Sequence, residues 1–301
     1  MKILIVGRQG MLAPEVDRCF RTSGFDVACK GRPEIDLGKP DSIRDVLLQN
    51  QPSLIINAAA YTAVDQAESE PDVAFSINRD GVQVLAGECH RLGIPLIHIS
   101  TDYVFDGERH CPYREGDPPS PLGVYGQSKW EGEEAVRQGQ PHHIIFRTAW
   151  LYSIYGRNFL KTIVTRAKEG KELRVVNDQY GCPTWAKDVA SALLVLTQTI
   201  SNGKQVPWGT YHFCGAGKTT WYEFAQAIIN HAQEISSFQV KDVTPITTED
   251  YPTVVKRPAY SVLDCSKIHQ AFGIGPPRWQ DSMQQCVKEL FACPDLLHAR
   301  S

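Results

Sequence analysis

The sequence lacks any long apolar run and any strong excess of charge of one sign. No run approaches the roughly 18 apolar residues that a membrane-spanning helix needs, so we expect no membrane protein. The net charge of −3 at pH 7 gives no electrostatic reason to expect nucleic acid or an anionic membrane as a partner. The opening MKILIVG is broken by Gly7 too early for a secretory signal, which predicts a cytoplasmic protein.

Cysteines are present, but their pattern indicates neither a disulfide framework nor a metal site. The nine cysteines are an odd number, with no C-x-x-C pair and no Cys/His cluster of zinc spacing. Some of them, such as Cys29 and Cys214, lie in apolar runs, as reduced and buried thiols do. We therefore expect free thiols and no metal ligands.

The first half of the chain alternates short apolar runs with longer amphipathic stretches. The apolar runs predict strands at 2–7, 25–29, 53–59, 95–101 and 142–150. They are continuously apolar, as in a parallel sheet covered by helices on both faces. The amphipathic stretches predict helices near 11–23, 41–50, 71–93 and 125–138. This rhythm predicts an α/β fold, with a doubly wound, Rossmann-like parallel sheet in a dinucleotide-binding domain over residues 1–150.

After residue 150 the rhythm is less regular. The pattern predicts helices at 157–169, 186–200, 220–233 and 280–291, and strands at 172–178 and 209–215. Proline and turn residues punctuate 245–277. We expect residues 151–301 to form mainly a smaller, mixed C-terminal substrate-binding lobe, with about 186–215 returning to the first domain. A cleft between the two lobes is the expected ligand site.

The first predicted strand runs into a glycine-rich turn, Gly7-x-x-Gly10-x-x-Ala13, and then into a helix. Glycine lets the backbone turn tightly and approach a pyrophosphate without a side chain in the way. The helix N-terminus adds unsatisfied N–H groups and a partial positive charge. The alternative is a purely structural turn, but its place at the start of a βαβ series favours nucleotide binding.

The second predicted strand is followed by cations rather than by an acidic residue. An acidic residue there would bind the ribose diol of NAD, whereas Lys30 and Arg32 suit the 2′-phosphate of NADP. The alternative is that both are solvated loop charges. The sequence therefore favours NADPH and leaves NADH open.

Three polar residues at the carboxyl edge of the predicted sheet point to carbonyl reduction. Thr101 ends the fourth strand, and Tyr125 and Lys129 lie four positions apart on the next helix, so they share one face. The Tyr125 phenol would protonate the developing alkoxide, and the Thr101 hydroxyl would hold the carbonyl oxygen beside it. We expect the Lys129 ammonium to lower the pKa of Tyr125 from its ordinary value of about 10.

Several motifs together resemble the extended short-chain dehydrogenases/reductases. They are the glycine turn, NAAAYTAVDQAE (57–68), INRDG (77–81), STDYVFDG (100–107) and YGQSKWEGE (125–133). More narrowly, FRTAWLYSIYGRNF (146–159), NDQYGCPT (177–184) and RPAYSVLD (257–264) resemble the dTDP-4-dehydrorhamnose reductase family. This resemblance runs from Met1 to about Phe291. It implies NADPH- or NADH-dependent reduction of the C4 ketone of a nucleotide-linked deoxysugar, yielding dTDP-L-rhamnose.

The resemblance also implies roles for individual residues. Gly10, Met11 and Leu12 would line the pyrophosphate, and Asp36 and Leu37 would flank the adenine. Ala60, Tyr61 and Thr62 would follow the ribose and nicotinamide, with Tyr125 and Lys129 also contacting the cofactor. Thr101, Asp102 and Trp150 would contact the sugar, while Asn158 and Arg257 could serve its diphosphate.

Some of these assignments keep alternatives. Trp150 could be ordinary core, Asn158 and Arg257 could make a loop hydrogen bond and a surface charge, and His98 is expected to be a satisfied core histidine. Some relatives use Mg²⁺ in dimer assembly, but no acidic cluster in the sequence assigns that ion, so the metal and a homodimer both stay open.

Two other functions stay open as well. YVFDG, PYREGD and LDCSK also resemble the methionine adenosyltransferase β subunit, a non-catalytic regulatory subunit in which NADP would be a structural ligand. A reductase of a different nucleotide 4-ketosugar is the other alternative, because pocket shape decides the stereochemistry of the product. The intact Thr101, Tyr125 and Lys129 favour an enzyme.

Overall fold

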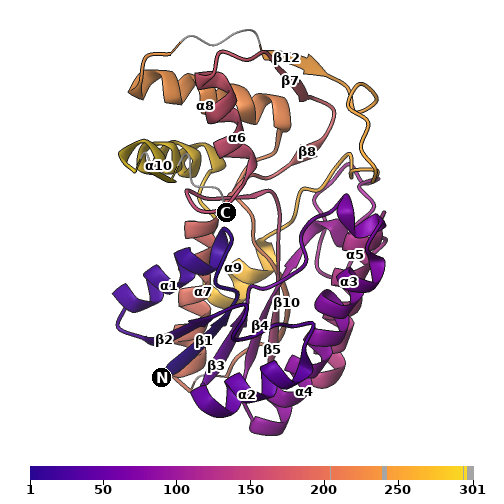
Figure 1. The fold of residues 1–301 in the computed structure, drawn as a ribbon, viewed down its shortest axis with the longest axis vertical. Coiled ribbons are helices and arrows are strands. Elements are labelled where there is room, and N and C mark those ends of the chain that lie inside the picture. The colour runs from indigo at the N-terminus through magenta and orange to yellow at the C-terminus, as the bar shows by residue number, and fades with distance from the viewer. Residues whose placement is uncertain (204, 239–242, 294, 297–301) are drawn as a thin grey trace.

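A computed structural model describes residues 1–203, 205–238, 243–293 and 295–296. Its centre is a six-stranded sheet of order β10-β5-β4-β3-β1-β2, in which every pairing is parallel. The strands are β1 (Lys2–Val6), β2 (Asp26–Lys30), β3 (Leu54–Asn57), β4 (Leu96–Thr101), β5 (His143–Thr148) and β10 (Gly209–His212). The predicted doubly wound sheet is confirmed (Figure 1).

Helices cover both faces of this sheet, which explains the continuously apolar strands. Side chains alternate between faces along a strand, so Ile3 and Ile5 pack on one side and Leu4 and Val6 on the other. The first side is covered by α1 (Leu12–Thr22), α7 (Ala186–Ser201) and α9 (Ser266–Phe272). The second is covered by α2 (Pro40–Asn50), α4 (Gly81–Leu92) and α5 (Val124–Gly139).

The remaining elements form a smaller lobe above the carboxyl edge of the sheet (Figure 1). It contains α6 (Phe159–Lys168), α8 (Trp221–Ile235) and α10 (Trp279–Ala292), with their own apolar cluster around Leu160, Phe224 and Val287. Short strands complete it: β7 (Leu173–Val176) pairs with β12 (Val243–Ile246), and β8 (Tyr180–Gly181) with β11 (Thr219–Thr220). A further pair, β6 (Leu151–Tyr152) and β9 (Thr184–Trp185), lies where the chain leaves and re-enters the main sheet.

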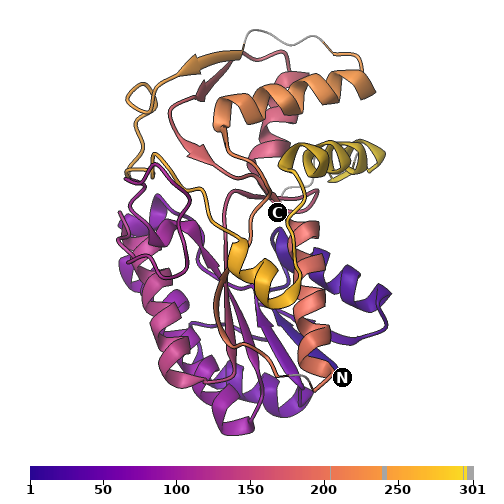
Figure 2. The same cartoon turned by 180° about the vertical axis from the view of Figure 1, so that it is seen from behind.

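The structure adds detail to the predicted elements in two places. The helix expected over 71–93 is confirmed, and it contains a π-helical turn at Ser76–Asp80 between α3 (Pro71–Phe75) and α4. The stretch 245–277, which proline and turn residues punctuate and for which no helix or strand was predicted, contains the end of β12 and the helix α9, which lies between the sheet and the upper lobe (Figure 2). Both α9 and β12 are short, and their apolar patterns are too brief to show a period.

The chain order places the ligand edge. From β1 the sheet grows to β2 on one side and to β3, β4 and β5 on the other, so the order reverses at β1. In open α/β sheets ligands bind at the carboxyl ends of the strands beside such a reversal. Among the residues described, no helix is long and apolar enough to cross a membrane.

Candidate active site

The glycine turn after β1 has the backbone geometry of a phosphate cradle. Gly7 and Gly10 have φ angles of +114° and +111°, a region that side chains with a Cβ disfavour. A Cβ on Gly7 would stand 3.0 Å from the Ala59 nitrogen, whereas no described atom beyond its chain neighbours lies within 4 Å of that position on Gly10. The open side at Gly10 faces the start of α1, where Met11 is the cap residue and Leu12 is buried.

A cationic group lies at the end of β2, and it is larger than the sequence indicated. Lys30 is 4.0 Å and Arg8 is 3.1 Å from the carboxylate of Glu34. A Cβ on Gly31 would stand 2.8 Å from the Arg8 Cβ, so Arg8 lies against the chain beside exposed Arg32. The sequence did not indicate Arg8, because it follows β1 in the glycine turn, 22 positions before Lys30 at the end of β2.

The two residues expected at the adenine lie differently. Asp36 is half-buried, and its carboxylate accepts a hydrogen bond from the Gly38 N–H at 3.0 Å. Leu37 is buried in the core beneath α4, with a Cβ on Gly81 coming within 2.8 Å of its side chain.

The loop of Ala60, Tyr61 and Thr62 is connected to α5 by Asn78, whose role the sequence did not reveal. Asn78 accepts a hydrogen bond from the Tyr61 N–H at 2.8 Å and donates to the Tyr61 carbonyl at 3.0 Å. It also donates to Ser128 Oγ at 3.0 Å, and Ser128 donates to the Tyr125 carbonyl at 2.9 Å. Asn78 lies in the π-helical turn, a device often found at functional sites.

Glycines let α5 approach its neighbours closely. A Cβ on Gly126 would stand 2.2 Å from the Tyr103 carbonyl oxygen, and one on Gly132 would stand 2.0 Å from that of Asn78. Such distances are far shorter than ordinary van der Waals contact, so only glycine fits. The glycines around the Tyr125–Lys129 pair therefore set the position of the helix that carries it.

The structure brings Thr101 and Tyr125 together. Thr101 is the last residue of β4, and Tyr125 is the second residue of α5, each less than one-tenth exposed. Burial raises the pKa of Tyr125 above its ordinary value, and the hydrogen bond with Thr101 lowers it by less. The Tyr103 ring packs edge-on against Tyr125, with centroids 5.5 Å apart. The phenol therefore holds its proton at neutral pH.

The amine of Lys129 contacts β4. Its amine donates to the Ile99 carbonyl oxygen at 2.8 Å and lies 3.4 Å from His98 Nε2. Burial lowers the pKa of Lys129 to about 8, opposed by the charge of Glu133. The pKa of Tyr125 is raised mainly by burial, and the charge of Asp102 raises it further, so a lowering of this pKa by Lys129 stays a prediction.

His98 is buried, as expected, and it also lies against the group of Thr101, Tyr125 and Lys129, called the reaction corner below. Its Nδ1 atom is 3.0 Å from the amide nitrogen of Asn57, whose oxygen accepts a hydrogen bond from the Ala59 N–H. Its Nε2 atom faces Lys129. Burial and the Lys129 charge hold the pKa of His98 well below its ordinary value. Neutral His98 therefore links β3 to the amine of Lys129.

Asp102 is a second buried ionisable group beside the reacting hydroxyls. Its Oδ1 atom accepts a hydrogen bond from Thr101 at 3.1 Å, and its Oδ2 atom has no partner among the residues described. Burial raises the pKa of Asp102 to about 6, and the Ser261 and Thr101 hydroxyls oppose this rise. Asp102 is 2% exposed, so its Oδ2 atom is a buried acceptor without a partner among the residues described.

Trp150 lies two residues beyond the end of β5, where it is held in an unusual backbone conformation. Its φ angle is +46°, and strain of this kind in a bulky residue is typical of functional sites. Its ring stacks on Trp221 with centroids 3.5 Å apart and an interplanar angle of 6°. Trp221 in turn contacts Phe159. Trp150 is half-buried, so it is neither full core nor free surface.

The two residues expected at the diphosphate have different surroundings. Asn158 caps α6, accepting from the Lys161 N–H and donating to the Ser153 carbonyl at 2.7 Å, so local structure occupies its amide. Arg257 is 2.5 Å from Asp65 and donates to the Tyr103 hydroxyl at 3.3 Å. Because Tyr103 packs on Tyr125, Arg257 lies close to the reaction corner. The side chain of Asn158 instead stabilises the start of α6.

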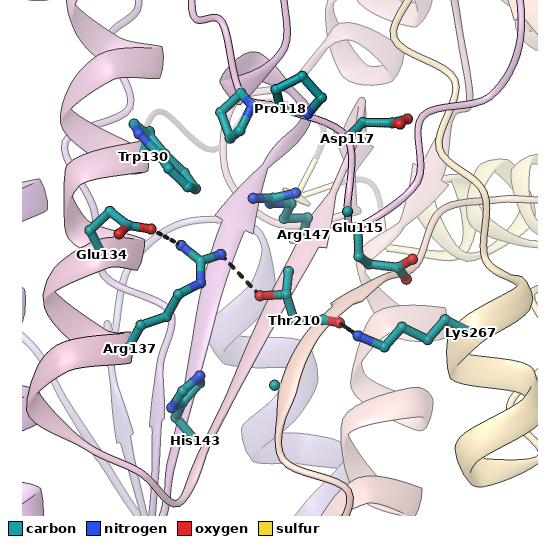
Figure 3. A pocket seen from close by; sticks show the side chains of 13 residues that line it. Glu115, Asp117, Pro118, Trp130, Glu134, Arg137, His143, Arg147, Thr210 and Lys267 are labelled. Atoms are coloured by element: carbon teal, nitrogen blue, oxygen red, sulfur yellow. Dashed lines mark hydrogen bonds and ion pairs between the residues drawn. The ribbon is translucent and has the colours of Figure 1, made fainter.

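A separate pocket of about 500 Å³ opens beside β5 and β10, away from these residues. Trp130, Arg137, Arg147, Thr210 and Lys267 line it together with residues 115–119 (Figure 3). Its cations are already engaged: Arg137 contacts Glu134 and Thr210, Arg147 pairs with buried Glu133, and Lys267 donates to the Thr210 carbonyl. None of the predicted site residues lines this pocket.

Acidic side chains gather elsewhere without forming a metal cage. Within the described part of the chain, no group of three or more His, Cys, Asp or Glu side chains is arranged to hold a metal ion. Glu15 and Glu289 are bridged by Arg18, and Lys187 contacts Glu289. A guanidinium and an ammonium therefore stand where a cation would balance these carboxylates.

Comparison with known proteins gives consistent matches over almost the whole chain. The family model described as the RmlD substrate binding domain matches residues 1–292. Relatives called dTDP-4-dehydrorhamnose reductase include one from Aggregatibacter actinomycetemcomitans, 43% identical with 94% of this chain and 97% of the relative covered. Another, from Sinorhizobium fredii, is 41% identical over 95% of this chain and 97% of the relative.

A solved structure gives the same result in three dimensions. The dTDP-4-dehydrorhamnose reductase from Bacillus anthracis, crystallised in complex with NADP, superposes with a TM-score of 0.88. It is 33% identical and covers 96% of this chain and 99% of its own. With the glycine turn, the Thr101–Tyr125 pair and the parallel sheet already in place, these matches show that the chain belongs to the RmlD substrate binding domain family, alongside the dTDP-4-dehydrorhamnose reductases.

Proposed function

We propose that this protein reduces the C4 ketone of dTDP-4-dehydro-L-rhamnose to give dTDP-L-rhamnose, with NADPH as the reductant. The observation that carries the proposal is the hydrogen-bonded pair of hydroxyls, Thr101 and Tyr125, at the ligand edge of the sheet. Relatives that share 41–43% of the sequence over nearly full length are dTDP-4-dehydrorhamnose reductases, which supports this substrate over other ketosugars.

The residues present fit a dinucleotide. The open side of Gly10 leaves the space that a pyrophosphate needs, and the start of α1 offers N–H groups and a positive dipole end to it. Arg8, Lys30 and Arg32 would hold the 2′-phosphate of the adenosine ribose. The loop Ala60–Thr62, fixed by Asn78, would follow the nicotinamide half. NADPH bound in this way supplies the hydride for the ketone carbon.

The chain supplies the proton and the geometry. Tyr125 keeps its proton at neutral pH and would give it to the ketone oxygen as that oxygen gains negative charge. The Thr101 hydroxyl, whose single proton is donated to Asp102 Oδ1 in this structure, would turn that proton to the same oxygen, and the hydroxyl oxygen is held in place because it accepts from the Tyr103 N–H at 3.2 Å. The buried amine of Lys129 would bind ribose hydroxyls from below. One hydride and one proton convert the ketone to the alcohol, so the reaction balances.

The sugar would lie between the reaction corner and the stacked pair of Trp150 and Trp221, called the aromatic corner below. The Oδ2 atom of Asp102, which is buried and without a partner among the residues described, would accept from a sugar hydroxyl once the contacts that cover it open. The exposed part of Trp150 would cover the apolar side of the deoxysugar, while Arg257 would reach the diphosphate after leaving or sharing Asp65. Asn158 would act indirectly, by holding the segment that follows Trp150.

The test is a reduction assay with a product analysis. Purified protein is mixed with NADPH and dTDP-4-dehydrorhamnose, loss of absorbance of the reduced nicotinamide is followed, and the sugar product is identified by NMR. We expect stoichiometric oxidation of NADPH and the L-rhamno configuration at C4. Tight NADPH binding without turnover would contradict the proposal and favour the regulatory subunit, and another C4 configuration would favour a different ketosugar.

A second test addresses the choice of cofactor. The double variant Lys30→Ala/Arg32→Ala should weaken NADPH binding more than NADH binding, because only NADPH carries the 2′-phosphate. Arg8→Ala should act in the same direction, and Lys39→Ala, a cation before α2, is the matched control. Equal weakening for both cofactors would show that these cations do not read the 2′-phosphate.

The assembly of the protein is a separate prediction. We expect a homodimer in the cytoplasm, and light scattering with and without Mg²⁺ measures its mass and any need for the ion. Because Arg18 and Lys187 already balance Glu15 and Glu289, the mass should not change on chelation. A monomer, or a mass that falls on chelation, would contradict this prediction.

A further inference from the structure

Three cysteine thiols from separate segments meet outside the reaction corner. Cys182 lies between β8 and β9, Cys214 lies two residues beyond β10, and Cys265 directly precedes α9. The sulfur atoms of Cys214 and Cys265 are 3.8 Å apart, although the residues are 51 positions apart in the chain. The Cys182 thiol is close enough to hydrogen-bond to Cys214. All three belong to one apolar cluster with Phe105 and Tyr113.

The position of the Cys214–Cys265 pair in the fold is specific. At Cys214 the chain leaves the main sheet and builds β11, α8 and β12 in the upper lobe. It comes back to the sheet at Cys265, where α9 begins between the two lobes (Figure 2). The two thiols therefore lie at the exit and the return of one continuous excursion.

We propose that Cys214 and Cys265 form an oxidation-sensitive pair that small peroxides convert to a disulfide, joining the exit and the return of this excursion. A disulfide has an S–S distance of about 2.05 Å, so closure needs a movement of roughly 1.8 Å, within the range of side-chain rotation. The Cys214 N–H already donates to the Cys265 sulfur at 3.4 Å, which holds the two segments in register.

The solvent exposure of the thiols determines which of them is oxidised first and which then closes the disulfide. Cys265 is partly exposed, whereas Cys214 and Cys182 are each 2% exposed. The Cys265 thiolate attacks hydrogen peroxide, giving a sulfenic acid, and the displaced hydroxide leaves as water with the thiol proton. The Cys214 sulfur then attacks the Cys265 sulfur, and its proton leaves with the hydroxyl as a second water. Two thiols and one peroxide thus give one disulfide and two waters.

Cys182 is the natural competitor, and the structure disfavours it. It is buried beside Cys214, so a peroxide reaches Cys265 first and the resolving thiol closest to Cys265 is Cys214. Hydrogen bonds to the other two thiols and burial raise the pKa of Cys214 well above its ordinary value, so it reacts slowly with a free oxidant. We therefore expect Cys265 to react with the peroxide first and Cys214, rather than Cys182, to form the disulfide with it.

The experiment uses the reduced full-length protein in its folded state. It is treated with one equivalent of hydrogen peroxide, the remaining thiols are alkylated, and the tryptic peptides are analysed without reduction. The three thiols lie in different tryptic peptides, 175–187, 205–218 and 257–267, so each linkage has its own mass. We expect the 205–218 peptide joined to the 257–267 peptide, reversed by dithiothreitol, together with a rise of several degrees in melting temperature.

Matched variants make the result decisive. Cys182→Ala should keep the cross-link, and Cys265→Ser should abolish both the cross-link and the shift in melting temperature. The double variant Cys111→Ser/Cys293→Ser removes the two exposed thiols and should behave as the wild type does. A linkage of Cys182 to Cys214, or oxidation of Cys265 without any cross-link, would overturn the proposal. Because the wild type and Cys182→Ala carry the main test, it does not depend on the folding of a Cys214 variant.

Discussion

The two sides of the candidate site are held in different ways. The reaction corner around Thr101, Tyr125 and Lys129 is fixed by hydrogen bonds from β3, β4, the π-helical turn and α5. The aromatic corner around Trp150 is held by stacking on Trp221 and by a strained backbone. A hydrogen-bond network fixes atoms within a few tenths of an ångström, whereas a stack allows the ring to slide.

This difference suggests a division of work between the corners. Proton transfer needs exact placement of two hydroxyls, and the reaction corner provides it with buried polar groups that are almost all satisfied. Covering an apolar sugar face needs a large apolar contact area rather than precisely oriented groups, and the two indoles provide that area. Changes in the reaction corner should therefore act on turnover, and changes in the aromatic corner on the Michaelis constant.

The largest effect should come from Tyr125→Phe. This variant keeps the ring that packs against Tyr103 but removes the proton, so kcat for the ketosugar should fall by about 10²–10⁴-fold, the usual contribution of general acid catalysis. The measurement is steady-state kinetics with a titration of NADPH affinity, which should survive. Tyr113→Phe removes another buried phenol hydroxyl, one that donates to Asp106, and should leave kcat within a few fold. Near-normal turnover in Tyr125→Phe would remove the phenol from the mechanism.

The sequence alone predicted the features that depend on local spacing and missed those that depend on contacts between distant positions. The strands, the glycine turn and the Thr101–Tyr125 pair were predictable, because each depends on local spacing or on the end of an apolar run. Asn78 was not, because its partners lie 17 and 50 positions away, and no periodicity links them. Trp221 was missed for the same reason, since a stack across 71 positions leaves no pattern in either segment.

The position of the Lys129 amine was not predictable for a related reason. Spacing of four residues places two side chains on one helix face, but it does not say where a long, flexible amine ends. The nearest carbonyl, that of Ile99, and the buried His98 belong to β4, and they draw the amine toward the sheet. The direction of that amine depends on the tertiary structure.

The second largest effect should come from Trp150→Ala. Losing an aromatic surface of this size costs roughly 1–3 kcal/mol of sugar binding, so the Michaelis constant should rise by about ten-fold or more while NADPH affinity stays nearly constant. The measurement combines ketosugar kinetics, NADPH titration and thermal unfolding on one preparation. Trp208→Ala, an indole outside the site, is the control for lost packing. A destabilised protein with unaltered sugar kinetics would make Trp150 a core residue.

A smaller effect, on stability and pH, should come from Asp102→Asn. The folded protein raises the pKa of Asp102 from 3.8 to about 6, so it binds more protons than the unfolded chain between these values. Stability from this group is therefore fully present below pH 3.8 and is lost as the pH rises through 6. The Asn variant avoids that loss and should gain about 2–3 kcal/mol relative to the wild type between pH 4 and pH 7.

Denaturant unfolding of both proteins across this pH range measures the effect. Asp106→Asn is the control with the opposite sign, because hydrogen bonds from Tyr113 and the Glu108 N–H outweigh burial and lower the pKa of Asp106. Its stability relative to the wild type should fall as the pH rises. If Asp102→Asn showed no dependence on pH, the buried carboxylate would be solvated in solution.

The smallest effect should come from Gly181→Ala, which tests the aromatic corner without touching an aromatic residue. A Cβ on Gly181 would stand 2.2 Å from Cε2 and 2.5 Å from Nε1 of Trp150, so the indole must move. Gly181 does not have a positive φ angle, so alanine adds no backbone strain of its own.

Because a stacked ring can slide over its partner, the Trp150 indole can move away from the added methyl group. We therefore expect a rise of only a few fold in the Michaelis constant for the ketosugar, with kcat unchanged. The circular dichroism signal of the coupled Trp150–Trp221 pair should weaken at the same time. Gly116→Ala, whose Cβ would have no neighbour within 4 Å among the residues described, is the matched control and should change neither quantity. A large fall in kcat in Gly181→Ala would show that the aromatic corner also sets the geometry of proton transfer, and the division of work between the two corners would then be wrong.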